Sequence, residues 1–315
     1  MPDLRGSDCS LKPAVACATQ GSWHGIGMAK GGTLWDIRTQ FPLMNPGGLS
    51  MKPDPLSALL HRGAGQHGPI MLMYHAITQD EATPAWPWAV SMRRFRSQLD
   101  FLAAEGYTTT TMGELITAPA GAWPARTAVI TFDDGYADNL AAVDELERRG
   151  MRASWFIVTG SIGEIPQWPA DGRPRGRMLD AAELREMHRG GMEVGSHTVT
   201  HVRLPEVDDA RLARELNDSK HTLEDMLGTE ITSFAYPYGA WDERCARAVA
   251  RAGYTGACTT RTGWALRDRD PYGLRRLTVF NHDTTNSFAR KLHFGSHDVR
   301  WRDVAAYAFK RMRKR

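Results

Sequence analysis

From residue 69 onward the chain alternates between short, unbroken apolar runs and longer segments whose apolar residues recur every three or four positions. The runs 69–74 and 127–132 are typical of buried parallel strands, because such strands are covered on both faces. Between them, the apolar spacing predicts a helix that begins after Ser91 and ends at Gly106. The pattern therefore opens with a strand, a helix and a second strand.

The same alternation continues toward the C-terminus. In chain order the pattern predicts helix 139–149, strand 153–158, helix 180–189, strand 192–196, helix 208–227, strand 231–235, helix 242–252 and strand 256–258. Strands that alternate with helices indicate a parallel sheet with the helices outside it. Functional residues of such folds collect at the carboxyl ends of the strands, so the sequence after each strand is where chemistry is expected.

The two ends of the chain differ from this regular middle part. Residues 1–65 contain 10 of the 30 glycines and 6 of the 17 prolines and have no sustained apolar period, which predicts a low-order extension. A single domain is expected over residues 66–285. Residues 286–315 predict a basic amphipathic tail, which is either a solvated terminus or a peripheral contact with an anionic membrane.

Composition narrows the class of protein. The 315 residues include 42% hydrophobic and 24% charged residues, which excludes a collagen-like, largely disordered or multi-span membrane protein. The net charge of +3 is too small to indicate a nucleic acid partner. Four cysteines without a CxxC motif do not indicate a disulfide scaffold. Because no secretory leader or membrane span is visible, we expect a cytoplasmic location.

Two polar motifs follow predicted strands. Asp133 and Asp134 come directly after the strand 127–132, and such adjacent carboxylates are costly to bury unless a positive charge such as a metal ion lies beside them. His197 and His201 follow the strand 192–196, and their i, i+4 spacing places both imidazoles on one face of a helical turn. Either motif alone also fits a plain turn or capping residue. Together they predict a catalytic metal site, because two imidazoles and one carboxylate leave positions for water and substrate.

A third motif, Pro237-Tyr238-Gly239, predicts a tight turn after the strand 231–235. A backbone N–H exposed in such a turn is able to stabilise an oxyanion, although the motif alone indicates only the turn.

Taken in order, the motifs TFDDG (131–135), SHTVTH (196–201) and PYG (237–239) resemble those of the polysaccharide deacetylases, the NodB-homology domain of carbohydrate esterase family 4. The resemblance spans about residues 69–283. The early LMYHAI (72–77) and FRSQLDFL (95–102) are similar to the subgroup that deacetylates poly-N-acetylglucosamine.

This resemblance implies a fold and a set of roles. The fold is a deformed (β/α) barrel of about seven parallel strands. Asp134, His197 and His201 are implied to hold a divalent metal, with zinc the preferred identity. Asp133 is implied to be the general base, and the backbone N–H of Tyr238 to help hold the oxyanion.

The chain also departs from the family pattern. Ala235 stands where many members have the arginine that orients the base, and Arg276 is a candidate replacement, although a surface position is an equal alternative. The late histidine that supplies the general acid in many members is displaced to His282. In the poly-N-acetylglucosamine subgroup the acid comes from the early Tyr-His motif, so His75 is the first choice and His282 the second.

The predicted function is metal-dependent hydrolysis of N-acetyl groups on amino sugars of a polysaccharide or its precursor. Tyr238, Arg276 and Trp168 are the substrate-binding candidates, Trp168 because a flat ring in an irregular segment suits a sugar. The expected partner is an N-acetylated oligo- or polysaccharide. Alternatives are another non-peptide amide (peptidoglycan, a chitin oligomer or a small amide), a catalytically silent carbohydrate-binding module, and a purely structural metal site.

Overall fold

The structure is a computed structural model that describes residues 53–62, 67–79, 82–119, 121–168, 173, 176–297, 299–301 and 305. Within these ranges no helix has the length and apolar character that a membrane crossing requires.

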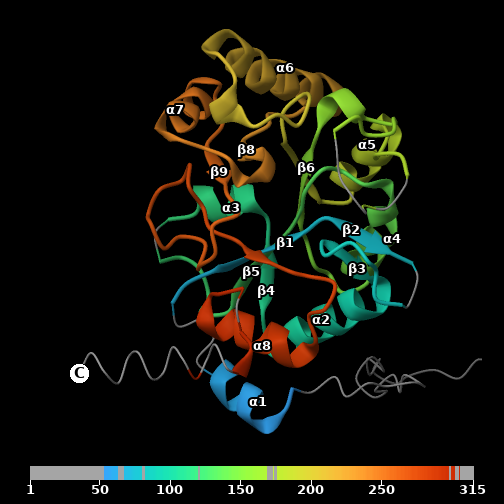
Figure 1. The fold of residues 1–315 in the computed structure, drawn as a ribbon, viewed down its shortest axis with the longest axis vertical. Helices are drawn as coiled ribbons and strands as arrows, with labels where there is room; N and C mark the ends of the chain where they lie inside the picture. Colours follow the sequence, from blue (N-terminus) through green and yellow to red (C-terminus); the bar gives the residue numbers. More distant parts are fainter. Residues whose placement is uncertain are drawn as a thin grey trace, which may run out of the picture. The chain divides into compact units, whose positions relative to one another are not determined.

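A parallel sheet forms the centre of the fold (Figure 1). Its strands are β1 (Ile70–Tyr74), β4 (Thr108–Thr110), β5 (Thr127–Phe132), β6 (Ser154–Ile157), β7 (Glu193–Ser196), β8 (Ser233–Ala235), β9 (Gly256–Cys258) and β10 (Leu277–Thr278). Across the described part of the chain, the spatial order is β10-β1-β5-β6-β7-β8-β9, with β4 beside β5. All of these pairings are parallel, and the predicted deformed (β/α) barrel of about seven strands is confirmed.

The two edges of strand β5 are paired differently. One edge pairs with a single strand, β1, from Ala128 to Phe132. On the other edge, β4 pairs with the first half of β5, and β6 pairs only with its last two residues, Thr131 and Phe132. The chain that leaves β5 therefore emerges between β1 and β6, at the carboxyl end of the sheet.

The core confirms why these runs form strands. Every residue of β1 and β5 is buried, as expected for strands with both faces covered. Aromatic rings fill the space above them: the rings of Phe132 and Trp155 stack with centroids 4.5 Å apart, and Phe95 packs edge-on against Tyr74. Each such side chain contributes roughly 1.5–3 kcal/mol by its burial.

Helices cover the sheet, and several begin and end where the sequence predicts. They are α1 (Pro55–His61), α2 (Met92–Ala104), α3 (Met112–Thr117), α4 (Leu140–Glu147), α5 (Ala181–Arg189), α6 (Asp209–Leu227), α7 (Glu243–Arg251) and α8 (Thr285–Phe294). Asp180 begins α5 with a capping box formed with Glu183, and Asp208 caps α6. Helix α6 ends at Gly228, whose φ of 67° is left-handed.

Two of these helices lie in the segments predicted to flank the domain. Helix α1 belongs to residues 1–65 and helix α8 to the tail, yet Arg290 Nη1 of α8 donates to Ser57 Oγ of α1 at 2.7 Å, and Phe288 and Leu292 are buried. Because Phe288 also packs edge-on against Phe101 of α2, helix α8 contacts the domain directly, and α1 contacts α8. The rest of the predicted extension and the basic run 310–315 lie outside the described residues and stay predictions.

Candidate active site

The turn after β5 sends two neighbouring carboxylates in different directions. Asp133 N–H donates to the Tyr74 carbonyl of β1 at 3.0 Å, which fixes the start of the turn. Asp134 then adopts a φ of 72° and Gly135 a φ of 92°. A positive φ is rare for a residue with a side chain and persists only where the surroundings enforce it. This backbone conformation directs the side chains of Asp133 and Asp134 to different groups of neighbouring residues.

The segment after β7 brings two imidazoles to Asp134, but not on a helical turn as predicted from their spacing. Residues 197–203 are irregular, and Thr198 and His201 have φ values of 72° and 58°. The carboxylate of Glu215 on α6 holds this loop by accepting the backbone N–H groups of Val199 and Thr200, each at 2.9 Å. Hydrogen bonds to α6, and not a helical turn, therefore set the conformation of the loop that contains His197 and His201.

Asp134, His197 and His201 converge on one point. Asp134 Oδ1 lies 3.5 Å from His197 Nε2 and 3.3 Å from His201 Nε2. All three side chains are buried, and one ligand atom from each lies within 4.8 Å of the others. The structure therefore brings together the three residues that the motifs predict as metal ligands.

The hydrogen bonds of this cluster suit a divalent cation. His197 Nδ1 lies 2.7 Å from the Ala235 carbonyl, to which it donates, so Nε2 keeps its lone pair toward Asp134. Asp134 Oδ1 is buried and accepts no hydrogen bond within the part of the chain that the structure describes. Burial raises the pKa of Asp134, but the neighbouring imidazoles, His201 above all, outweigh it and hold the pKa well below its usual value. Two nitrogens and an anionic oxygen form a donor set typical of zinc.

Asp133 faces a buried arginine instead. Arg276, which precedes β10, binds both of its carboxylate oxygens, with Nη1–Oδ1 at 2.6 Å and Nη2–Oδ2 at 2.7 Å. Arg276 also donates to Thr131 Oγ1 and the Thr259 carbonyl. Burial raises the pKa of Asp133, but Arg276 outweighs that effect and lowers it. Asp133 is thus held ionised in one orientation.

The burial and hydrogen bonds of Arg276 indicate whether it contacts a substrate or the Asp133 carboxylate. Its side chain is 0% exposed, and its N–H groups are directed to protein acceptors. It therefore lies behind Asp133 and not on the surface that a substrate would touch, although the sequence grouped it with the substrate-binding candidates. The arginine beside Asp133 thus comes from the segment before β10, whereas β8 ends in Ala235.

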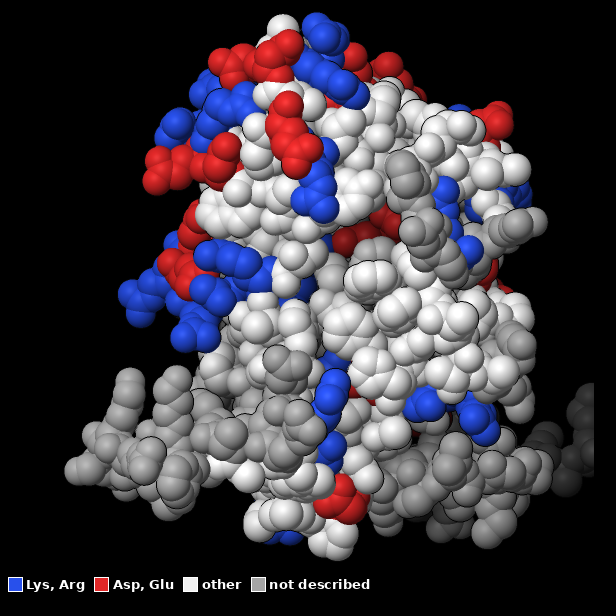
Figure 2. All heavy atoms as spheres, in the orientation of Figure 1, with Lys and Arg blue, Asp and Glu red and all other residues white. Residues whose placement is uncertain are grey.

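A cavity of about 630 Å³ lies over both aspartates. The space-filling view in Figure 2 shows a hollow near the middle of the molecule, with acidic side chains at its floor. Trp168 and Tyr238 form part of the wall, and their rings lie 4.7 Å and 4.5 Å from the ring of His201. Tyr238 is 43% exposed and has a φ of 58° in the turn after β8. Both predicted residues therefore border the space beside the cluster.

The two candidate acids take different places. His75 follows β1 and lines the cavity, and its buried Nδ1 has no hydrogen-bond partner in the described ranges. Burial lowers the pKa of His75, against the opposing charges of Asp134 and Asp133. His282 is exposed, stacks on Phe280 and does not line this cavity. The geometry favours the first choice over the second.

Sequence reasoning missed several residues of the wall. Trp86 and Trp88 lie next to His75, and the short parallel pair β2 (Ala76–Thr78) and β3 (Ala89–Ser91) holds their segment there. Their Trp-Pro-Trp sequence just before a predicted helix was an available signal. His297, which follows α8, also lines the cavity, and no pattern in the sequence marks it.

Comparisons with known proteins agree with this geometry. The family model for polysaccharide deacetylase matches residues 120–257. YxkH of Bacillus subtilis (strain 168), assigned to the polysaccharide deacetylases, is 30% identical over 231 residues, which cover 72% of this chain and 77% of YxkH. The chain belongs to the polysaccharide deacetylase family. Its members are hydrolases that act on carbon–nitrogen bonds other than peptide bonds.

Other relatives of this deacetylase have narrower names. The poly-beta-1,6-N-acetyl-D-glucosamine N-deacetylase of Staphylococcus aureus (strain N315) is 26% identical, over 53% of this chain and 59% of that one. Among solved structures, the deacetylase PplD of Streptococcus pyogenes has a TM-score of 0.60 and 26% identity, covering 69% of this chain and 94% of PplD. IcaB of Ammonifex degensii has a TM-score of 0.59 and 26% identity, covering 73% and 97%.

Proposed function

We propose that this deacetylase removes N-acetyl groups from the amino sugars of a polysaccharide or its precursor by metal-dependent hydrolysis. The observation that carries the proposal is the convergence of Asp134, His197 and His201 beside the Arg276-bound carboxylate of Asp133, inside a cavity with aromatic walls. The narrower names of the relatives support an N-acetylated glucosamine polymer as the substrate class.

Asp134, His197 and His201 would hold the metal, with zinc preferred for this donor set. A bound divalent cation lowers the pKa of water and polarises a carbonyl. The contribution of the chain is to keep the ligands in the correct state. The Ala235 carbonyl fixes the tautomer of His197, and Asp134 stays ionised because its pKa is held low.

Asp133 is the proposed general base. It takes the proton from the attacking water, and each of its oxygens keeps a second lone pair while Arg276 occupies the first. Arg276 holds the carboxylate in one orientation, which places the proton acceptor in advance of the reaction. The positive charge also keeps Asp133 ionised at neutral pH.

His75 is the proposed general acid. It lines the cavity that Asp133 lines, and its Nδ1 is buried without a partner among the described residues. Trp86 packs edge-on against the imidazole, with ring centroids 5.8 Å apart, and holds it in place. The protonated ring donates to the departing amine, so acetate and a free amino sugar are the products. The backbone N–H of Tyr238 is the proposed oxyanion donor.

Acetate release from a panel of N-acetylated glycans tests the proposal. The metal-reconstituted protein should release acetate from glucosamine oligomers, and Asp133→Asn should lower kcat by about 10²–10⁴-fold. Asp144→Asn, which makes the same change at an exposed position of α4, is the control and should retain activity. Unchanged activity of Asp133→Asn would overturn the assignment of the base.

The panel also separates the alternatives. Acetate from peptidoglycan or chitin oligomers, without turnover of poly-N-acetylglucosamine fragments, would move the substrate to another amide. Sugar binding with no acetate from any glycan would indicate a silent carbohydrate-binding module.

A further inference from the structure

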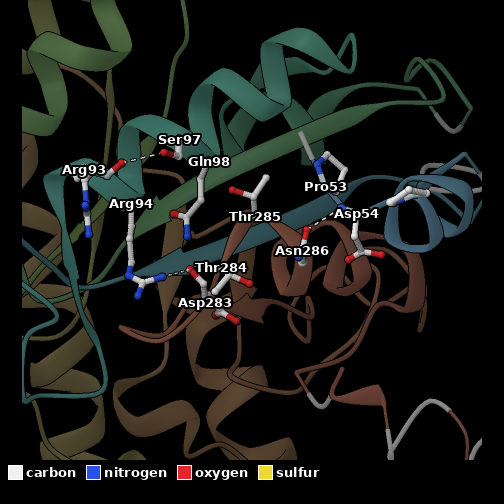
Figure 3. Close-up of a pocket in the computed structure, with 11 residues that line it drawn as sticks. Pro53, Asp54, Arg93, Arg94, Ser97, Gln98, Asp283, Thr284, Thr285 and Asn286 are labelled. Carbon is white, nitrogen blue, oxygen red and sulfur yellow. Dashed lines mark hydrogen bonds between the residues drawn. The ribbon is translucent and has the colours of Figure 1, made fainter. Parts of the chain in front are cut away.

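A second cavity, of about 640 Å³, lies between α1, α2 and the start of α8 (Figure 3). It shares no lining residue with the cavity over Asp133 and Asp134. Its wall includes Arg93, Arg94 and Gln98 of α2 together with Thr285 and Asn286 of α8. The proposed reaction uses none of these residues, although Gln98 lies within the motif FRSQLDFL (95–102). We call this space the α2–α8 cavity.

Gln98 presents a buried donor without an acceptor to the α2–α8 cavity. The side chain is 2% exposed, and its Oε1 accepts the hydroxyl of Tyr74 at 2.9 Å. With the oxygen toward Tyr74, Nε2 is turned the other way, and Figure 3 shows the amide directed toward the start of α8. Nε2 is buried and has no hydrogen-bond partner among the described residues. Such a buried donor is unfavourable unless a ligand satisfies it.

Positive charge faces the same space. Arg93 is exposed and forms no ion pair within the described part of the chain, while Arg94 donates to the Asp283 carbonyl at 3.0 Å. Helix α8 has ten residues and begins at the cavity. Thr284 Oγ1 accepts Ser287 N–H, and the N–H groups of Thr285 and Asn286 lie in the same first turn, at the positive end of the helix dipole.

The two carboxylates in the wall are already engaged. Asp283 is buried, pairs with Lys291 and accepts the Phe280 N–H at 2.8 Å. Asp54 accepts the N–H and the hydroxyl of Ser57 at 2.9 Å and 2.7 Å. Lys291 offsets the charge of Asp283, and Arg290 Nη1 lies 3.8 Å from Asp54 Oδ2, so both negative charges are countered within the protein.

We propose that the α2–α8 cavity binds a small organic ligand that carries an oxyanion, a phosphate or a carboxylate. The oxyanion lies between Arg93 and the first turn of α8, where helix N–H groups and a guanidinium are both suited to it. The amide Nε2 of Gln98 donates to the same ligand from the buried side. This proposal is independent of the chemistry proposed for Asp133 and the metal cluster.

Titration calorimetry on the full chain tests it, with glucose 1-phosphate, glucuronate and inorganic phosphate as probes and neutral glucose for comparison. At least one oxyanion probe should bind with a Kd below about 1 mM, and glucose should not. The phosphate and carboxylate arms distinguish the two sources of the oxyanion. Absence of binding by all three anions at 10-fold higher concentration, or equal binding of glucose, overturns the proposal.

Variants assign the binding to this cavity. Arg93→Gln changes an exposed side chain and should weaken binding at least tenfold. Gln98→Glu keeps the acceptor for Tyr74 and places a like charge against the anion, so it should abolish binding. Arg96→Gln on the same helix is the matched control and should bind normally, since its partner Glu145 retains Arg148 and Arg149.

Each variant result has a defined meaning. Binding that Arg93→Gln leaves unchanged belongs to another site, including the cavity over the metal cluster, and overturns the proposal. That reading does not depend on Gln98→Glu, so a folding defect in the buried variant leaves the test intact. If Arg96→Gln weakened binding as much as Arg93→Gln, the effect would come from the net charge of the protein and not from this cavity. That result would also overturn the proposal.

Discussion

Asp133 and Asp134 are adjacent in the chain and have opposite environments. Asp134 lies among imidazoles with an oxygen that accepts no hydrogen bond, whereas both oxygens of Asp133 bind Arg276. The left-handed backbone at Asp134 produces this division, because it turns the second side chain away from the first. Two identical side chains thereby become suited to two different tasks.

Arg276→Lys should separate orientation of the base from binding of substrate. Lysine keeps the charge but has no planar pair of donors, so Asp133 loses its bidentate contact. We expect kcat to fall about 10–100-fold with KM nearly unchanged, measured by acetate release. Arg275→Lys, at the neighbouring residue whose partner Asp268 lies near the surface, is the control and should have normal kinetics. A raised KM with unchanged kcat would instead mean that Arg276 acts on the substrate.

Asp138 should make stability depend on pH. Burial raises the pKa of Asp138 to about 7, against the opposing hydrogen bond from Ile77 N–H. Because this pKa lies above the unfolded value near 3.8, the stabilising protonated form is fully present below pH 4 and is lost as the pH rises through 7. Asp138→Asn removes that loss and keeps the acceptor for Ile77.

Chemical denaturation at pH 4.5 and pH 8 measures the effect. The free energy of unfolding of Asp138→Asn, relative to the unsubstituted protein, should increase by on the order of 2 kcal/mol between these pH values. Parallel pH profiles of the two proteins would contradict the shifted pKa.

At the scale of elements, the loop after β7 is held in place by α6, the next α-helix along the chain. Glu215 of α6 accepts two consecutive backbone N–H groups of this loop and the hydroxyl of Thr200. The same loop carries both imidazoles of the cluster. Helix α6 thus holds the loop that places His201 beside Asp134.

Glu215→Gln should loosen the cluster. The amide has one acceptor oxygen in place of two and no charge, so the backbone pair keeps only a neutral acceptor and the Thr200 hydroxyl has to accept instead of donate. We expect metal affinity to fall about 10–100-fold, as for other residues that orient ligands, measured by competition with a chromophoric chelator. Asp225→Asn, an exposed change on the same helix, should leave affinity unchanged. Equal affinities of both variants would show that the loop keeps its shape without Glu215.

Some elements follow from local sequence and others do not. The apolar runs predict β1, β5, β6 and β7, and glycine correctly marks the end of α6. Strand β4 and the pair β2–β3 have three residues each and were not predicted. Such short strands exist because they find a partner strand, so their own sequence contains little signal.

At the scale of the whole molecule, the cluster lies at the edge of a core that is complete without it. The strands β1 and β5 are buried along their full length, and aromatic packing above them involves none of the cluster residues. Removal of a metal should therefore abolish activity while the fold remains.

Chelation followed by circular dichroism and acetate release tests this expectation. Treated protein should keep its far-ultraviolet spectrum and lose activity, and added zinc should restore activity. The midpoint of thermal unfolding should fall, because a ligand at 1,000 times its Kd contributes about 4 kcal/mol to stability. Unfolding on chelation would instead support a structural role for the metal.

The sequence by itself determined the alternation of strands and helices, the family, and the order of the three motifs, since each is written in residues a few positions apart. Only the tertiary structure decided which distant residues complete the site. Arg276 reaches Asp133 across 143 positions of chain, and His75 enters the cavity where His282 does not. The physical reason is that local patterns encode backbone conformation, whereas contacts between strand ends depend on how the whole sheet assembles.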